Sequence, residues 1–564
     1  LFGNMEGELS VVMGGEAGDG VRAAGGVLGR ILNRHGLYSF LREDYQSLIR
    51  GGHNYSQVRA SKEKVRSQIE EADIVVALDE RSVENHEWRL MEKGKLIFDP
   101  DELEYSSEKA TPLPLSSMVE EAEGIEIMKN SAAIGAISYF YDLSLEIVEN
   151  VMGKVYGEKA EKNIVLAHKG HEFCKDNYEK VKDLECPDRE MTPLLTGNQA
   201  ISLGAVKAGL DVYIAYPMTP STSILHFTAS HQDDLGLTVV QPENEIGVIN
   251  MALGSAYAGA RAMVASSGGG FSLMQESMSL AGMSETPILV IECQRAGPST
   301  GVPTYTAQSD MDLAMCFGQG EFPSIVLAPG DTEEAFYRAG EGLNLAWKYQ
   351  VPVVLLSDKH LSESSMSTEL ELDKVSPEEA KIEKNPDSDY ERYRFTEDGV
   401  SPLAFPGSPD TVVKTTSYEH IEFGYTTEDP AEIEAMQDKR KRKWGGIEKD
   451  VMRREPVKVY GDENSDKLIL GWGSTKGAIL EAMKLIDSPT KFVQPIYLRP
   501  FPSKIVGDYI DGASKTVCVE NNATGQLAKL IRGETLKTVD EKVLKYDARP
   551  FNPPDLAKKL EVLL

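Results

Sequence analysis

The sequence predicts a multidomain α/β protein whose sheets are mainly parallel. The chain has 564 residues, which is long enough for three or four domains. Short apolar runs alternate with helical patterns along most of it, as in repeated βα units. Several of these runs are followed directly by polar or glycine-rich turns, which is typical of ligand-binding loops at the carboxyl ends of parallel strands. An apolar fraction of 41% and a charged fraction of 26% fit a globular protein.

The net charge of −30 argues against binding to nucleic acid, because neutralising phosphates takes clustered Lys and Arg. No run of about 18 consecutive apolar residues occurs, so no membrane span is predicted. The N-terminus has no signal-peptide pattern, and we therefore expect a cytoplasmic protein.

The five cysteines are scattered, and none forms a CxxC pair; they are Cys174, Cys186, Cys293, Cys316 and Cys518. Cysteine ligands of an iron–sulfur cluster or a structural zinc are normally closely spaced. We therefore predict free thiols and no metal site held by this chain alone.

A strand at 8–13 opens the first predicted domain and leads into a glycine-rich turn at 14–21 and then a helix. Such a turn brings backbone N–H groups close to an anion. Its spacing is GxxGxG, the reverse of the dinucleotide-binding GxGxxG. This disfavours an NAD-dependent dehydrogenase, and we expect the glycines to close a tight turn.

Further on, residues 50–52 (Arg-Gly-Gly) precede an alternating strand at 56–59, and two further strands are predicted at 73–78 and 95–98. Arg beside two glycines fits an anion-facing loop, and it fits a hairpin tip with a solvated Arg equally well. The first domain is expected to end near 185–188.

Four polar segments mark the second predicted domain: 211–222, 241–245, 266–276 and 294–301. Each lies at the end of an apolar run and before or within a helical pattern. Loops in this position gather at one edge of a parallel sheet, so we expect a ligand crevice there.

Candidate site residues lie in three of these segments. Thr219 precedes Pro220, a pattern that fits a helix N-cap with Pro in the first turn, and a helix start also binds carboxylates. Glu243 and Glu245 head a small-residue helix that we expect to be buried; either could be a capping group. Arg295 follows a strong strand and can bind a carboxylate bidentately.

From about 364 to 456 the chain is acidic, contains proline and has few long apolar runs, which predicts an irregular insertion or linker. Its basic run, 439–443, is predicted to be a solvated helix face rather than a docking site. A small α/β domain follows, with a strand and glycine turn at 467–474, strands at 492–493 and 516–520, and a final helix.

Several ordered motifs resemble one known family, the 2-oxoacid:ferredoxin oxidoreductases. Residues 216–221 (YPMTPS) resemble its YPITPS signature, residues 267–276 its SGPGxSLMxE segment, and residues 294–304 its QRGGPSTGxPT segment. Residues 471–474 and 520–527 are similar to the GST and ExNxxGQL elements of the same alpha subunit. Met218, Gly269 and Ala296 depart from the signatures, and Gly269 in place of Pro is expected to loosen a loop.

Residues 14–21 and 50–52 resemble the family's gamma module, here fused ahead of the alpha module. The resemblance implies a gamma Rossmann-like α/β domain, a pyrimidine-type domain of the thiamine-diphosphate-binding fold and a transketolase C-terminal-like α/β domain. We expect these three domains at 1–188, 189–368 and 459–564, in that order. The insertion is expected at 369–458.

The resemblance implies oxidative decarboxylation of a 2-oxoacid with coenzyme A, with electrons passing to ferredoxin. Thiamine diphosphate would supply the carbanion chemistry. A separate β subunit would hold the diphosphate, Mg²⁺ and a [4Fe–4S] cluster, and a dimer of αβ units is expected. Gly18-Asp19-Gly20 matches the start of the diphosphate motif, but no Asn pair follows at 45–50. The metal half of that motif is therefore missing, in accord with this division.

In the family, a glutamate of the alpha subunit hydrogen-bonds the aminopyrimidine ring, and the match assigns this role to Glu245, with Glu243 second. The match also implies that Thr219 and Arg295 bind the substrate carboxylate. The resemblance to the SGPGxSLMxE segment also implies that Ser267, Gly268 and Gly269 bind the cofactor. Arg50 and Asn54 are expected at the entrance for coenzyme A or substrate.

Pyruvate and branched or aryl 2-oxoacids are alternative substrates, while the fused gamma–alpha arrangement favours 2-oxoglutarate. A non-catalytic assembly scaffold is a further alternative, and the joint presence of Glu245, Thr219 and Arg295 argues against it.

Overall fold

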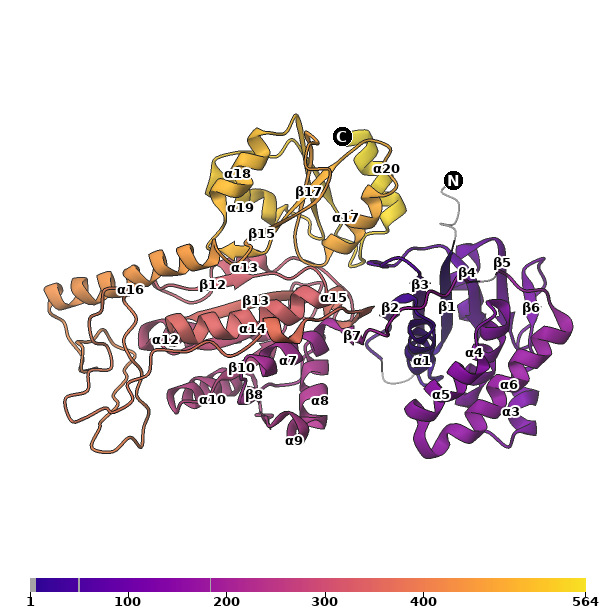
Figure 1. Ribbon diagram of the computed structural model, residues 1–564, viewed down its shortest axis with the longest axis horizontal. Coiled ribbons are helices and arrows are strands. Elements are labelled where there is room, and N and C mark those ends of the chain that lie inside the picture. Colours follow the sequence, from indigo (N-terminus) through magenta and orange to yellow (C-terminus); the bar gives the residue numbers. More distant parts are fainter. Residues whose placement is uncertain (1–6, 49–50, 183) are drawn as a thin grey trace. The chain divides into compact units, whose positions relative to one another are not determined.

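The computed structural model describes residues 7–48, 51–182 and 184–564. These residues form two compact units (Figure 1). Unit 1 comprises Leu1–Thr196, Ser364–Glu369 and Asn552–Asp555, and unit 2 comprises Gly197–Glu363, Leu370–Phe551 and Leu556–Leu564. Each unit is described separately.

Unit 1 is built on one eight-stranded mixed sheet in the order β6-β5-β4-β1-β3-β2-β14-β7. The central strand β1 is parallel to β4 and antiparallel to β3. The strands are β1 (Glu8–Glu16), β2 (Tyr38–Asp44), β3 (His53–Ser61), β4 (Ala72–Ala77), β5 (Leu90–Phe98), β6 (Ala110–Pro112), β7 (Leu194–Thr196) and β14 (Ser365–Ser367). Its helices are α1 (Val21–Arg34), α2 (Glu80–His86), α3 (Leu115–Glu121), α4 (Lys129–Phe140), α5 (Leu145–Tyr156) and α6 (Ala160–Asn177).

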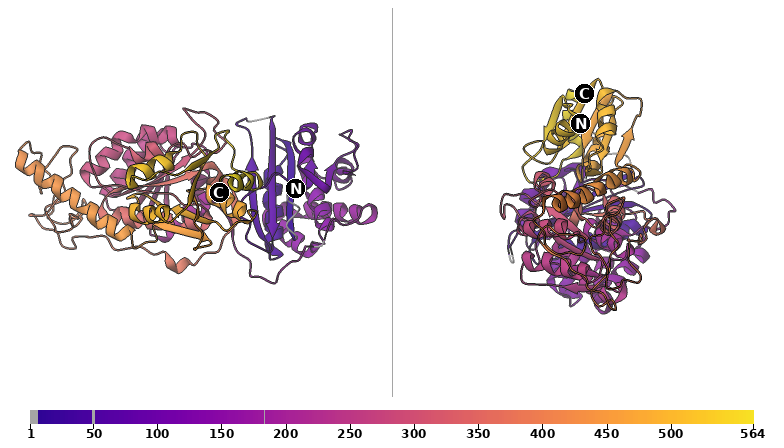
Figure 2. Two further views of the ribbon diagram at one scale, coloured as in Figure 1. Left: turned by 90° about the horizontal axis from the view of Figure 1, so that it is seen from above. Right: turned by 90° about the vertical axis from the view of Figure 1, so that its left-hand side faces the viewer.

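Most helices of unit 1 cover one face of this sheet (Figure 2). Leu9, Val11 and Met13 of β1 pack in one core with α1 and with α3 to α6. Helices α4 and α6 approach very closely, because a Cβ at Gly135 would collide with the backbone of Ala167. The alternating side chains of β1 thus fix which face the helices cover.

The first sheet of unit 2 has seven strands in the order β18-β12-β13-β11-β10-β8-β9, all parallel except β18. The strands are β8 (Val212–Ile214), β9 (Thr238–Val240), β10 (Ala262–Ser266), β11 (Ile288–Gln294), β12 (Ile325–Leu327), β13 (Pro352–Asp358) and β18 (Tyr497–Arg499). The helices along this part are α7 (Gly197–Lys207), α8 (Thr222–Ser230), α9 (Gln232–Leu235), α10 (Glu245–Tyr257), α11 (Gly268–Leu273), α12 (Gln275–Ser284), α13 (Met311–Met315), α14 (Thr332–Tyr349) and α15 (Lys359–Glu363).

Helices lie on both faces of the seven-stranded sheet, so its central strands are apolar on both sides. Met263 and Leu289 pack in a core with α7 and α14, while Val264 and Val290 pack in a second core with α10 and α12. The apolar runs at 287–294, 325–327 and 352–356 form most of β11, β12 and β13.

A smaller sheet in unit 2 has five strands in the order β15-β17-β16-β19-β20. Its elements are β15 (Val457–Gly461), β16 (Lys467–Gly471), β17 (Lys491–Pro495), β19 (Lys515–Glu520) and β20 (Glu541–Leu544), with helices α17 (Thr475–Met483), α18 (Ser503–Asp511), α19 (Gln526–Thr535) and α20 (Pro553–Leu563). The strand and glycine turn predicted at 467–474 are β16 and residues 472–474, and α17 follows them.

The predicted insertion is irregular over residues 375–429, which carry isolated β-bridges but no helix or longer strand. It ends in a long helix, α16 (Pro430–Val451), seen at the left of Figure 1. Four 3₁₀ turns complete the described chain: Glu87–Arg89, Glu126–Met128, Gly157–Lys159 and Leu372–Lys374.

The prediction that 439–443 is a solvated helix face is wrong for three of its five residues. Lys439, Arg440 and Lys443 are buried, while Lys441 and Arg442 are exposed. The Nζ atoms of Lys439 and Lys443 both form ion pairs with the buried carboxylate of Glu285, at 2.7 Å from Lys439. The ion pairs with Glu285, at the end of α12, therefore account for the burial of this face of α16.

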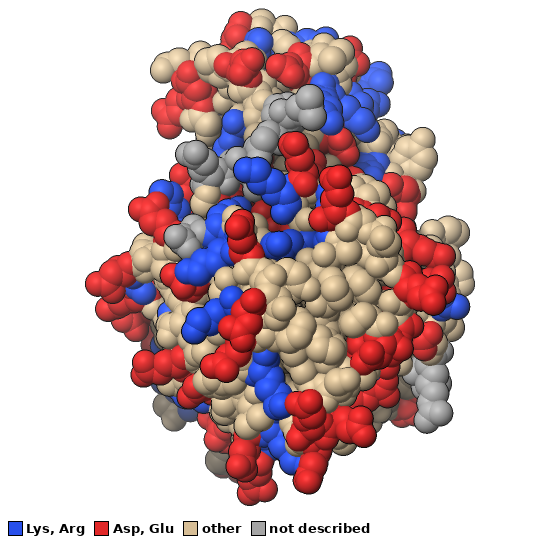
Figure 3. Space-filling view, turned by 90° about the vertical axis from the view of Figure 1, so that its right-hand side faces the viewer, with Lys and Arg blue, Asp and Glu red and all other residues tan. Residues whose placement is uncertain are grey.

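On the face shown in Figure 3, acidic and basic side chains are interspersed around an uncharged area. No helix of the described residues is both long enough and apolar enough to cross a membrane.

Candidate functional site

The structure brings the predicted site residues of unit 2 to one edge of the seven-stranded sheet. Strands β11, β10, β8 and β9 are neighbours in that order and run parallel. Arg295 follows β11, Ser267 follows β10, Thr219 follows β8 and Glu245 follows β9. The four loops therefore meet at the carboxyl ends of adjacent strands, as the sequence predicts.

Glu245 is the first residue of α10, and only 3% of it is exposed. It does not cap the helix: the side chain of Asn244 does so, accepting a hydrogen bond from the Gly247 N–H at 2.9 Å. Glu245 Oε1 is buried and has no hydrogen-bond partner among the described residues. Buried polar atoms are nearly always paired, so this oxygen is a candidate for a bond to a ligand.

Glu243, the second candidate, is exposed. Its carboxylate lies beside Gly247, where a Cβ would be 3.3 Å from Oε1. The geometry therefore favours Glu245 of the two. Helix α10 is not fully buried as expected, because Ile246 and Met251 on its outer side are 51% and 42% exposed.

The segment after β10 lies directly against Glu245. A Cβ at Gly270 would lie 2.7 Å from Cγ and 2.8 Å from Oε1 of Glu245. Gly268 and Gly269 form the first turn of α11, so the expectation of a loosened loop at Gly269 is wrong. Ser267 precedes the helix, and its buried Oγ has no partner among the described residues.

Thr219 does not cap a helix as predicted. The Thr219–Pro220 peptide bond is cis, and α8 begins only at Thr222, with Ser221 at its N-cap. These two residues belong to the turn after β8. The carbonyl oxygen of Thr219 accepts a hydrogen bond from Arg295 Nη1 at 2.9 Å.

Arg295 is partly buried beside this turn. Burial lowers the pKa of its guanidinium, and the negative charge of Asp310 opposes that effect. An Arg in this position retains several N–H groups for a carboxylate ligand.

Sequence reasoning missed two carboxyl groups next to this site, the buried Glu292 and the partly buried Asp310. Glu292 lies within β11 and is fully buried. Asp310 packs against Gly268, where a Cβ would collide with its carboxylate. A glutamate inside a continuous apolar strand is the signal that could have revealed the first of them, because a buried carboxyl needs a reason to be there.

The two motifs of the C-terminal part, residues 471–474 and 520–527, contact the segment that carries Asp310 and hold it in place. Gln308 donates from Nε2 to the Trp472 carbonyl oxygen at 2.8 Å, and its Oε1 accepts from the Asn521 N–H at 3.0 Å. Asn522 donates from Nδ2 to the Gln308 carbonyl oxygen at 3.1 Å. These motif residues therefore fix the position of a neighbouring loop.

In unit 1, Arg50 lies outside the described residues. Asn54 lies in β3, and its Oδ1 accepts a hydrogen bond from the Gln46 N–H at 3.2 Å, across the connection between β2 and β3. The glycine-rich turn is tight, as predicted: Gly18 and Gly20 have positive φ.

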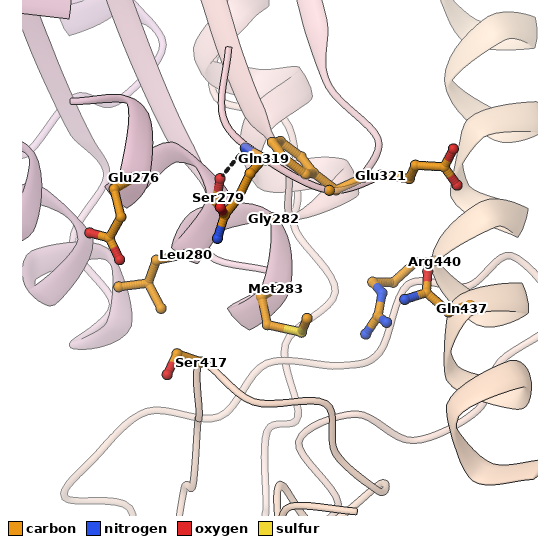
Figure 4. A pocket seen from close by; sticks show the side chains of 12 residues that line it. Glu276, Ser279, Leu280, Gly282, Met283, Gln319, Glu321, Ser417, Gln437 and Arg440 are labelled. Atoms are coloured by element: carbon orange, nitrogen blue, oxygen red, sulfur yellow. Dashed lines mark hydrogen bonds between the residues drawn. The ribbon is translucent and has the colours of Figure 1, made fainter. Parts of the chain in front are cut away.

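No group of three or more His, Cys, Asp or Glu side chains in the described chain could hold a metal ion. A cavity of about 380 Å³ in unit 2 lies elsewhere, between α12, residues 319–322 and α16 (Figure 4). Its lining includes Glu276, Met283 and Arg440, and none of the predicted site residues.

Two family models match this chain. Residues 203–439 match the thiamine-diphosphate-binding family of pyruvate flavodoxin/ferredoxin oxidoreductases. Residues 10–173 match the pyruvate ferredoxin/flavodoxin oxidoreductase family.

Two curated relatives and one solved structure match nearly the whole chain or most of it. The 2-oxoacid:ferredoxin oxidoreductase alpha subunit of Sulfolobus sp is 34% identical over 98% of this chain and 96% of its own. The 2-oxoglutarate oxidoreductase subunit KorA of Mycobacterium tuberculosis is 32% identical over 77% of this chain and 68% of its own.

The solved structure is the 2-oxoglutarate:ferredoxin oxidoreductase of Magnetococcus marinus with 2-oxoglutarate, coenzyme A and succinyl-CoA bound. It is 31% identical and covers 99% of both chains with a TM-score of 0.90. With its thiamine-diphosphate-binding domain and full-length relatives, this chain belongs to the alpha subunits of the 2-oxoacid:ferredoxin oxidoreductases.

Proposed function

We propose that this chain, together with a β subunit, catalyses the coenzyme A-dependent oxidative decarboxylation of a 2-oxoacid, with 2-oxoglutarate favoured, and passes electrons to ferredoxin. The observation that carries the proposal is the buried, unpartnered Glu245 Oε1 in a thiamine-diphosphate-binding domain. The preference for 2-oxoglutarate is supported by the ligands of the Magnetococcus structure and by the name of the Mycobacterium relative.

The residues that would hold the aminopyrimidine end of the cofactor belong to the start of α10 and to the segment after β10. Glu245 would hydrogen-bond the ring, and Ser267, Gly268 and Gly269 would line it. When bound, thiamine diphosphate supplies the carbanion chemistry of decarboxylation. The protein's part is to hold one carboxyl group in a dry position against the ring, which is what the burial of Glu245 favours.

The substrate carboxylate would be bound by Arg295 and Thr219. The bond from Arg295 to the Thr219 carbonyl uses one N–H of the guanidinium and fixes its plane. The remaining N–H groups can then bind a carboxylate in a charge-assisted pair. Both residues lie on loops that adjoin the segment after β10, which packs on Glu245. The substrate would therefore be bound next to the cofactor.

A β subunit would cover the outer side of α10 and α11. Three large apolar side chains are exposed there, Ile246, Met251 and Leu273, at 51%, 42% and 52%. Exposed apolar groups around a buried acid are typical of a surface that another chain completes. That subunit would hold Mg²⁺ and a [4Fe–4S] cluster, for which the described residues offer no ligand set.

Two further features complete the proposal. Arg50 and Asn54 of the gamma module would lie at the entrance for coenzyme A or substrate, and the enzyme would be a dimer of αβ units. Charge on Arg50 favours a phosphorylated ligand.

The experiment is an anaerobic purification of the native complex through a tag on this chain, followed by viologen reduction with a panel of 2-oxoacids. Reduction that requires coenzyme A, with the highest kcat/KM for 2-oxoglutarate, is expected. A complex that contains thiamine diphosphate and an iron–sulfur β subunit but reduces no viologen would overturn the proposal. A preference for pyruvate or an aryl 2-oxoacid would overturn the substrate alone.

A further inference from the structure

The cavity of about 380 Å³ between α12, residues 319–322 and α16 has no part in the proposed reaction (Figure 4). Its volume lies within the range of about 300–1,000 Å³ that is usual for small-molecule sites. The Gln319 N–H donates to Ser279 Oγ at 2.6 Å, so the loop at 319–322 is fixed to α12. Two walls of the cavity are therefore held together by the fold itself.

Arg440 is the one basic residue that lines this cavity. Only 3% of it is exposed, and its guanidinium points from α16 toward Met283 (Figure 4). Its Nη2 donates to Glu419 Oε2, which also accepts from Gln437 Nε2 at 3.0 Å. Its Nη1 is buried and has no hydrogen-bond partner among the described residues. Buried donors are nearly always paired, so Nη1 is a candidate for a bond to a ligand.

The charges around Arg440 favour an anion as that ligand. Four buried cationic side chains lie together with two carboxylates near the end of α12: Arg392, Lys439, Arg440 and Lys443, with Glu285 and Glu419. Burial lowers the pKa of Lys439 to about 7, against the opposing charge of Glu285. Even with Lys439 neutral, these six side chains carry one positive charge in excess, and a buried charge without a counter-charge is costly. An anion beside Arg440 would balance it.

The rest of the lining selects the kind of anion. Leu280, Met283 and Phe322 give the cavity an apolar wall that fits the body of a ligand. Glu276 and Glu321 also line the cavity and are exposed, and they repel a ligand with several negative charges, such as a nucleotide. The lining therefore fits a single carboxylate on an apolar body.

We propose that this cavity is a binding site for a small monocarboxylic acid, whose carboxylate accepts a hydrogen bond from Arg440 Nη1 and whose apolar body packs on Leu280 and Met283. None of the residues proposed for the cofactor or the substrate lines it. The site therefore does not depend on the proposed reaction.

The test is a binding titration of the purified native complex with hexanoate as the probe. Hexanamide, of similar size but without the charge, is the ligand control. Arg440→Gln removes the cation, and Met283→Trp fills the cavity while the ion pairs around Arg440 remain. Lys441→Met, on the exposed face of α16, is the matched control for the loss of a cation. Arg295→Ala removes the other arginine that is proposed to bind a carboxylate.

Wild type, Lys441→Met and Arg295→Ala are expected to bind hexanoate with equal Kd. In Arg440→Gln the Kd for hexanoate is expected to rise at least about tenfold, because a charge-assisted hydrogen bond is lost. The same rise is expected for hexanamide with wild type, for the same reason. Met283→Trp is expected to weaken hexanoate binding by a similar factor, because the indole ring occupies the space of the ligand.

Absence of saturable hexanoate binding to wild type would overturn the site. So would equal Kd values for hexanoate and hexanamide, or for wild type and Met283→Trp. Loss of binding in Arg295→Ala together with full binding in Arg440→Gln would overturn it as well, because the carboxylate would then lie at the residues proposed for the substrate. If Arg440→Gln does not assemble, Met283→Trp decides, since its ion pairs are intact.

Discussion

Arg295 Nη1 donates a hydrogen bond to the carbonyl oxygen of Thr219 at 2.9 Å, and this bond joins the loop after β11 to the loop after β8. Strand β10 lies between those two strands in the sheet. The bond therefore spans the segment after β10, which packs on Glu245. A single contact thus joins the two residues proposed to bind the substrate carboxylate.

Arg295→Ala should lower kcat/KM for the 2-oxoacid by about 100-fold, because a charge-assisted bond to the substrate carboxylate contributes roughly 1.5–3 kcal/mol. Most of the change should be a higher KM. Steady-state kinetics on the complex measure kcat and KM. The kcat/KM of Arg295→Lys is expected to lie between those of wild type and Arg295→Ala. An unchanged kcat/KM in Arg295→Ala would reject the assignment.

Gly270→Ala should reduce kcat strongly, because the new Cβ would collide with Ser266 Oγ and push against Oε1 of Glu245. Gly533→Ala in α19 is the matched control, since a Cβ there meets nothing within 4 Å. Both residues lie within helices, so helix propensity alone favours Ala in each case. Equal kcat values for the two variants would show that the packing of Glu245 against this segment does not matter.

Glu285→Gln should destabilise the complex by about 3–5 kcal/mol, because two buried ammonium groups would lose their counter-charge. Lys441→Met, on the exposed face of the same helix, should change the thermal midpoint little. Thermal unfolding of both variants measures this. A midpoint for Glu285→Gln equal to that of wild type would show that the ion pairs contribute nothing net.

The same cluster predicts a loss of stability in acid. Burial alone would raise the pKa of Glu285, but Lys439, Lys443 and Arg392 together hold it well below its ordinary value. A carboxyl whose pKa is lower in the folded state contributes stability above its unfolded pKa of about 4.3, and the contribution is lost as the pH falls below that value. In Glu285→Gln this part of the acid transition should be absent.

The sequence predicts the fold well where local pattern decides it. The apolar runs at 287–294 and 352–356 are strands β11 and β13, since a parallel sheet covered on both faces needs continuous apolar side chains. The gathering of four loops at one edge follows from the same rule. Helix α16 was not predicted over its length, because its residues are mostly polar.

The site is harder to predict where contacts distant in sequence decide it. The burial of Lys439 depends on Glu285, 154 positions earlier in the chain. The position of the Asp310 carboxylate against Gly268 likewise depends on a loop that the C-terminal motifs hold. Thr219 was assigned to a helix N-cap because Thr-Pro fits that pattern, yet the same pair forms a cis turn.

The most direct test of the account is the turnover of Glu245→Gln beside Glu243→Gln in the purified complex. The two glutamates are two positions apart, one buried and one exposed, so Glu243→Gln controls for the loss of a charge near α10. We predict that Glu245→Gln assembles normally and loses at least about 100-fold in kcat, while Glu243→Gln stays near wild type. Substantial activity in Glu245→Gln, or an equal loss in both variants, would contradict the central role of Glu245.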